Sequence, residues 1–146
     1  MNSESLEKAV AGCDYVVHTA SPVPDKGVPK DENVFIRPAV EGTLAVLRAA
    51  QKHKVKRVVV TSSISAVVMK KDENIKEIYD ESDWSEVEVC PAYDKSKTLA
   101  EKAAWDYLFS LPEEDRFELV CLNPGFILGP SLVPSDSSPT AVKMLM

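Results

Sequence analysis

The chain has 146 residues, of which 45% are hydrophobic, so it can bury one ordinary core and we expect a single domain or part of one. Its net charge of −6 argues against a nucleic-acid partner, and three scattered cysteines and two isolated histidines indicate neither a disulfide framework nor a metal site. It has no apolar run of membrane-helix length and no secretory signal, so we expect a cytoplasmic protein without a membrane partner.

The first predicted elements are a short helix and a strand. Two serines near the N-terminus precede the run LEKAVAG, which is typical of a capped helix that ends at Gly12. The segment DYVVHTA, from Asp14 to Ala20, is apolar and β-branched without alternation, which predicts a strand buried on both faces. The proline-rich stretch that follows can continue neither element.

Two further pairs of helix and strand are predicted. Apolar residues recur at helical spacing over 34–53, ahead of the strand RVVVTSS at 57–63. A second periodic segment covers 93–110, the strand ELVCLN covers 118–123, and the final residues have the pattern of a helix start. Strands alternating with such helices require parallel pairing through right-handed crossovers, so we expect an α/β fold with a doubly wound parallel sheet and helices on both faces.

Tyr93 and Lys97 are four residues apart on a predicted helix, so their side chains leave the same face. The ordinary interpretation of such a pair is an exposed helix on which the tyrosine packs and the lysine is solvated. The pair follows a loop, however, at the open end of the sheet, where ligands of this fold class bind, and the strand before it ends in the hydroxyl residues Thr61, Ser62 and Ser63. There an ammonium group lowers the pKa of a phenol, which is normally about 10.

The segments TSSISAV, YDKSK and NPGFILGP, in this order, resemble the extended short-chain dehydrogenase/reductase family, which is similar to NAD-dependent epimerases and dehydratases. The sequences HTASP, VEGTLAVLRAA, YDESDW and SKTLAEKAAWDYL narrow the resemblance to the branch of dihydroflavonol, cinnamoyl-CoA and aldehyde reductases. The resemblance covers nearly the whole chain and implies a single partial NAD(P)-binding, Rossmann-like domain over residues 1–146.

The resemblance implies that Tyr93 protonates a substrate carbonyl oxygen, Ser63 hydrogen-bonds that oxygen, and Lys97 lowers the pKa of Tyr93 and holds the nicotinamide ribose. Because the strand end is degenerate, Ser62 stays open as the alternative serine. The implied cofactor is NADP, with NAD also open, and no metal is implied. The implied cofactor-binding residues are Ala20, Thr61, Tyr93, Lys97, Pro124, Gly125 and Ile127.

The chain departs from the family pattern in three respects. It has Pro38, Ala39 and Glu41 where the wider family often has an asparagine. Its five glycines lack the spacing of the phosphate-binding fingerprint, so we expect the first strands to be missing. The chain also ends before the region in which the family binds substrate. We therefore expect a fragment that is inactive alone and that self-associates through the exposed edge of its first strand.

The leading hypothesis is an oxidoreductase that transfers hydride from NADPH to a small-molecule aldehyde, ketone or dihydroflavonol-like substrate. A nucleotide-sugar epimerase or dehydratase of the same fold is the nearest alternative, and it would usually have a Tyr-Gly pair where this chain has Val67, Val68 and Met69. A truncated, non-catalytic module that binds a partner through its sheet edge stays open as well.

Overall fold

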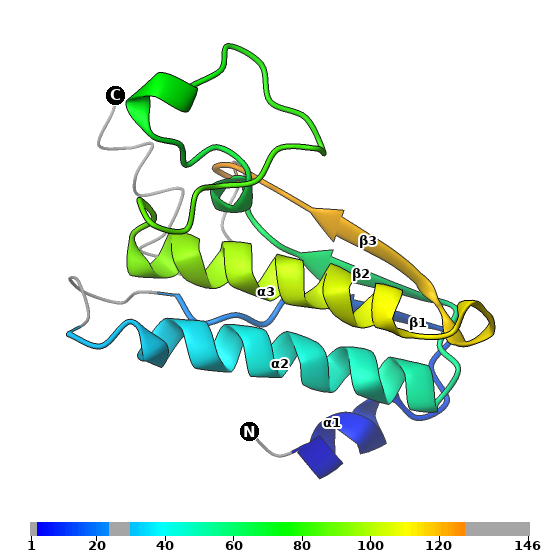
Figure 1. The fold of residues 1–146 in the computed structure, drawn as a ribbon. Coiled ribbons are helices and arrows are strands. Elements are labelled where there is room, and N and C mark those ends of the chain that lie inside the picture. The colour runs from blue at the N-terminus through cyan, green and yellow to red at the C-terminus, as the bar shows by residue number, and fades with distance from the viewer. Residues whose placement is uncertain (1–2, 24–29, 128–146) are drawn as a thin grey trace.

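The computed structural model describes residues 3–23 and 30–127, which form a sheet with helices packed on it (Figure 1). In this part of the chain the helices are α1 (Ser3–Val10), α2 (Asn33–Lys52) and α3 (Ala92–Ser110). The strands are β1 (Tyr15–His18), β2 (Arg57–Thr61) and β3 (Glu118–Leu122). Short 3-10 helices lie at Ile64–Ala66, Asp72–Asn74 and Glu113–Asp115. The predicted order of elements is confirmed, whereas the helix predicted at the C-terminus lies outside the described residues.

The three strands form a parallel sheet in the order β1-β2-β3. Tyr15 pairs with Arg57, and Arg57 pairs with Glu118, so the strands lie side by side with their carboxyl ends at one edge. The parallel α/β fold is thus confirmed. Both crossovers advance in the same direction across the sheet, and right-handed crossovers of this kind place α2 and α3 on the same face (Figure 1).

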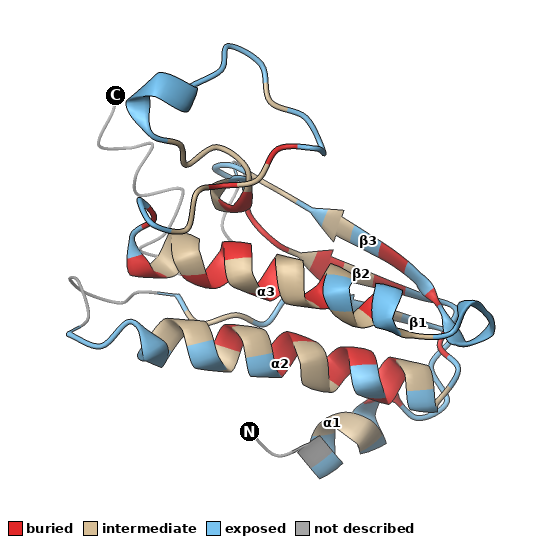
Figure 2. Cartoon of the chain, viewed as in Figure 1, coloured by how far each residue is buried: buried red, intermediate tan, exposed pale blue. Residues whose placement is uncertain are grey.

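The core lies between this face of the sheet and the two long helices (Figure 2). Ala50 of α2 and Ala104 of α3 are completely buried, and such small side chains let two helices lie close to each other and to the strands. The buried apolar residues of this core are Val10, Leu47, Ala49, Ala50, Val55, Val58, Val60, Ala104, Leu108, Phe117 and Leu119.

The opposite face of the sheet is open in the described part of the chain. Tyr15 and Val17 on β1 and Leu122 on β3 are exposed by 63%, 66% and 53%. The prediction that the first strand is buried on both faces is therefore wrong for these residues, because every second side chain of β1 faces away from the helices. β1 also forms one edge of the sheet, and self-association through this edge stays a prediction.

A glycine ends α1, and a proline lies inside α2. Gly12 follows α1 with a φ of +79°, a left-handed conformation that glycine adopts without steric cost, as predicted for the helix end. Pro38 lies inside α2, within its second turn, and the helix continues to Lys52. In the described part of the chain, none of the helices combines the length and apolar character that crossing a membrane requires.

Candidate active site

The first turns of α3 place Tyr93 and Lys97 over the carboxyl end of β2. Lys97 is only 7% exposed, and its Nζ donates a hydrogen bond to the backbone oxygen of Thr61 at 3.2 Å. The same Nζ lies 5.9 Å from the centroid of the Tyr93 ring. The helical spacing and the strand end therefore bring both side chains to one place, as the sequence indicates.

Ser63 lies beside Tyr93 at the start of the short helix that follows β2. Its Oγ accepts a hydrogen bond from the backbone nitrogen of Ser65 at 3.1 Å, which caps this turn, and its side chain lies close enough to the Tyr93 hydroxyl to affect the pKa of the phenol. Ser62 is buried with Lys97 in a neighbouring cavity, and its Oγ has no partner among the described residues. Of the two candidate serines, Ser63 is the one in contact with the phenol.

The pKa values at this site differ from the sequence expectation. Burial raises the pKa of Tyr93, the hydrogen bond with Ser63 opposes this rise, and the charge of Asp94 adds to it. The net shift is therefore upward, and the expected lowering of the Tyr93 pKa by the neighbouring Lys97 stays a prediction. Burial also lowers the pKa of Lys97, which the nearby carboxylate of Glu101 counteracts. At neutral pH the phenol thus keeps its proton.

Three of the residues expected to bind the cofactor, Ala20, Thr61 and Lys97, line one cavity at the ends of β1 and β2. His18 lines it too, and its Nε2 lies 3.4 Å from Oγ1 of Thr43 on α2. Burial, followed by the charge of Lys97, lowers the pKa of His18, so its ring is held neutral. The cavity thus brings a neutral imidazole and a buried ammonium group together at the ends of β1 and β2.

The segment after β3 is tied to the Ser63 turn at one point. The backbone oxygen of Pro124 accepts a hydrogen bond from the nitrogen of Ile64 at 3.0 Å. Gly125 faces open space among the described residues, since a Cβ at this position would meet none of their atoms within 4 Å, and Ile127 is 65% exposed. The structure therefore brings Pro124 to the site, whereas Gly125 and Ile127 are absent from the lining of the Lys97 cavity.

Two polar side chains that the sequence analysis did not single out complete the site. Nδ2 of Asn123 donates hydrogen bonds to the backbone oxygen of Ser63 at 3.0 Å and to Oε2 of Glu101 at 2.8 Å. Glu101 is only 7% exposed and lies one helical turn after Lys97. A carboxylate on the small-residue face of the helix, four residues after the lysine, is the signal that could have identified this contact.

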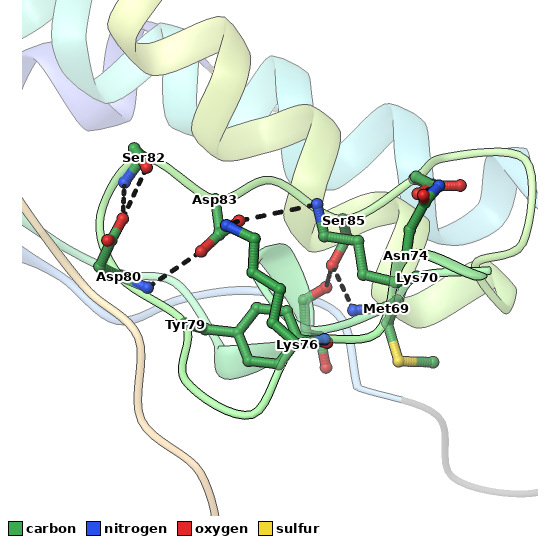
Figure 3. A network of polar contacts seen from close by, with 11 residues as sticks. Met69, Lys70, Asn74, Lys76, Tyr79, Asp80, Ser82, Asp83 and Ser85 are labelled. Carbon is green, nitrogen blue, oxygen red and sulfur yellow. Dashed lines mark hydrogen bonds and ion pairs between the residues drawn. The ribbon is translucent and has the colours of Figure 1, made fainter. Parts of the chain in front are cut away.

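A polar loop before α3 is fastened to the Ser63 turn by Ser85 (Figure 3). Ser85 is 2% exposed, and its Oγ donates to the backbone oxygen of Ser65 at 2.7 Å and accepts from the nitrogen of Met69 at 2.8 Å. Asp83 in the same loop pairs with Lys76 at 2.6 Å, and this contact lowers the pKa of its carboxyl group. The loop is thus ordered against the turn that carries the serine.

Curated relatives of this chain are reductases. The chain is 45% identical to tetraketide alpha-pyrone reductase 1 of Arabidopsis thaliana over 150 residues, which is 99% of this chain and 44% of the relative. It is 43% identical to cinnamoyl-CoA reductase 1 of the same plant, over 90% of this chain and 37% of the relative. The chain thus spans less than half the length of these curated relatives.

A solved structure shares the fold. The crystal structure of yeast methylglyoxal/isovaleraldehyde reductase Gre2 complexed with NADPH superposes with a TM-score of 0.73 at 34% identity, over 90% of this chain and 41% of the other. These relatives confirm the resemblance to the cinnamoyl-CoA and aldehyde reductase branch. The model of one family matches residues 1–137, and the chain belongs to this family, the 3-beta hydroxysteroid dehydrogenase/isomerase family.

Proposed function

We propose that the protein is an NADPH-dependent reductase that converts the carbonyl group of a small molecule, an aldehyde, a ketone or a dihydroflavonol-like compound, to an alcohol. The observation on which this rests is the meeting of Ser63, Tyr93 and Lys97 at the carboxyl end of β2, where the Tyr93 side chain lies beside both Ser63 and Lys97. A neutral phenol next to a hydroxyl and an ammonium group is suited to protonating a carbonyl oxygen.

Each residue has a separate role in this proposal. NADPH, when bound, supplies the hydride that adds to the carbonyl carbon. Tyr93 donates its proton to the carbonyl oxygen, and its raised pKa keeps that proton available at neutral pH. Ser63 hydrogen-bonds the same oxygen. Lys97 stabilises the phenolate left on Tyr93 by its positive charge, and its remaining N–H groups bind a ribose.

The cofactor assignment rests on the cavity and on the relatives. Ala20, Thr61 and Lys97 line the cavity beside Tyr93, and Pro124 lies against the turn that holds Ser63. We propose that these residues bind the nicotinamide end of NADPH together with Gly125 and Ile127, whose exposed positions leave room for a ligand. The yeast reductase with the shared fold is complexed with NADPH, which supports NADPH over NADH.

The nearest alternative is an epimerase or dehydratase of the same fold, in which the hydride returns to the substrate. Isotope transfer distinguishes the two reactions in the complete protein that carries this sequence. With NADPH that carries deuterium at both positions of nicotinamide C4 and an aromatic aldehyde as substrate, a reductase places deuterium on the carbinol carbon and forms one NADP⁺ for each alcohol. Product without deuterium, or conversion of a nucleotide sugar without net oxidation of NADPH, would refute the reductase.

A further inference from the structure

Glu101 connects the two halves of the proposed site. Its carboxylate accepts a hydrogen bond from Asn123 Nδ2 at 2.8 Å, and the same nitrogen donates to the backbone oxygen of Ser63 at 3.0 Å. Asn123 follows β3 and Ser63 follows β2, so this chain of contacts fixes the two strand ends relative to α3. Displacement of Glu101 would weaken one of the contacts that hold the backbone of Ser63, whose oxygen also accepts a hydrogen bond from the Ala66 nitrogen.

Glu101 also has an electrostatic relation to Lys97. Lys97 is 7% exposed, and its ammonium group has a backbone oxygen, that of Thr61, as its hydrogen-bond acceptor. A buried cation with so little compensation tends to lose its proton. The titratable groups that face it are His18 from β1, Tyr93 and Glu101 from α3, and beyond Glu101 the thiol of Cys121 on β3.

Among these groups Glu101 is the one that favours the charged lysine. It raises the pKa of Lys97 against the lowering effect of burial. The same negative charge acts on the neighbouring thiol, because burial and then Glu101 raise the pKa of Cys121 to about 12. A charge that stabilises a cation on one side and opposes a thiolate on the other explains both effects.

We propose that Glu101 is a positioning residue of the reductase site, which holds Ser63 in place through Asn123 and keeps the buried Lys97 ammonium charged. This role rests on the proposed function, since it serves the proton transfer by Tyr93. Glu101 lines the same cavity as Lys97, but in this proposal it acts through Asn123 and Lys97 and not on the reacting atoms. Its contribution is the geometry of the serine and the charge of the lysine.

The test compares Glu101→Gln with Asp106→Asn in the complete protein. Glutamine keeps an oxygen that accepts from Asn123 but removes the charge, whereas Asp106 is an exposed carboxylate on the same helix and serves as the matched control. The pKa of Lys97 is measured from the pH dependence of its acetylation by trace acetic anhydride, read by mass spectrometry. This measurement needs neither cofactor nor substrate.

We expect the pKa of Lys97 to fall in Glu101→Gln and to keep its wild-type value in Asp106→Asn. The alkaline limb of the pH profile of kcat should move to lower pH with it, while KM stays unchanged. If Glu101 were merely structural, its replacement would loosen the site, admit water and raise the pKa of Lys97, because burial is the main cause that lowers it. An unchanged or raised pKa of Lys97 would overturn the electrostatic part of the proposal.

A third variant, Glu101→Ala, tests the contact through Asn123. It removes the acceptor as well as the charge, so hydrogen exchange of the segment around Ser63 should be faster than in Glu101→Gln, and turnover should fall further, by up to about a hundredfold. Equal exchange in both variants would overturn the positioning role.

The wild-type protein distinguishes a failure of this inference from a failure of the proposed function. A wild-type protein that reduces no carbonyl refutes the reductase, whatever pKa is measured for Lys97.

Discussion

Replacing Ser85 by alanine should destabilise the protein far more than the loss of one small hydroxyl group suggests. The Ser85 Oγ makes two hydrogen bonds, at 2.7 Å to the Ser65 oxygen and at 2.8 Å from the Met69 nitrogen, and its residue is 2% exposed. Each bond contributes about 1 kcal/mol, so we expect a loss of about 2 kcal/mol in the free energy of unfolding. The Ser65 oxygen keeps a longer contact with Thr98, 3.4 Å, whereas the Met69 nitrogen loses its partner.

The matched control is Ser82→Ala in the same loop. Ser82 is exposed and its Oγ donates to Asp80 at 2.6 Å, so its loss should change stability by no more than about 0.5 kcal/mol (Figure 3). Equilibrium unfolding in urea of the complete protein measures both, with equal m-values as the check that the unfolded state has not changed. Equal midpoints for the two variants would refute the reasoning that Ser85 fastens the loop to the Ser63 turn.

Three further outcomes are expected. Burial and the charge of Lys97 lower the pKa of His18 below its usual 6.5, so the unfolded chain binds a proton at this residue more readily than the folded chain. The free energy of unfolding should therefore fall as the pH drops from 6.5 toward the folded-state pKa. Urea midpoints measured against pH should lose this dependence in His18→Gln. At pH 8 the exposed thiol of Cys13 should react with Ellman's reagent before the thiol of Cys121, whose pKa is raised to about 12. Peptide mapping that finds Cys121 modified first would contradict this prediction. The 146-residue chain by itself should self-associate through the edge strand β1 and the exposed face of the sheet. Sedimentation velocity should show less association for the Val17→Lys variant than for the wild-type chain. Unaltered association would exclude the exposed face of β1 as the interface.

The elements and the main residues of the candidate site could be predicted because they follow from local spacing. The separation of Tyr93 and Lys97 places both on one helix face, and the absence of alternation in the strands indicates parallel pairing. The choice between Ser62 and Ser63 could not be made in this way. It depends on the turn after β2, where the Ser63 Oγ accepts a hydrogen bond from the Ser65 nitrogen, while the Ser62 Oγ has no partner among the described residues.

The pKa of Tyr93 shows a second limit of local reasoning. The spacing correctly predicts a lysine beside the phenol, but it contains no information about how much water the fold removes from both groups. Burial dominates at Tyr93, so its pKa rises instead of falling. The contact of Asn123 with Glu101 joins a strand end to a helix across 22 residues, and such pairs follow from the tertiary fold rather than from periodicity.

Single-turnover reduction of a carbonyl substrate by Tyr93→Phe in the complete protein, saturated with NADPH, tests the central claim most directly. We expect the rate to fall at least about a hundredfold, because the proton donor is gone, while NADPH binding measured by fluorescence titration is unchanged. Tyr107→Phe on the same helix is the control: its hydroxyl donates to Gln51 at 2.7 Å, away from the site, so turnover should stay at the wild-type rate. A Tyr93→Phe variant that reduces the carbonyl at nearly the wild-type rate would contradict the assignment of Tyr93 as the proton donor.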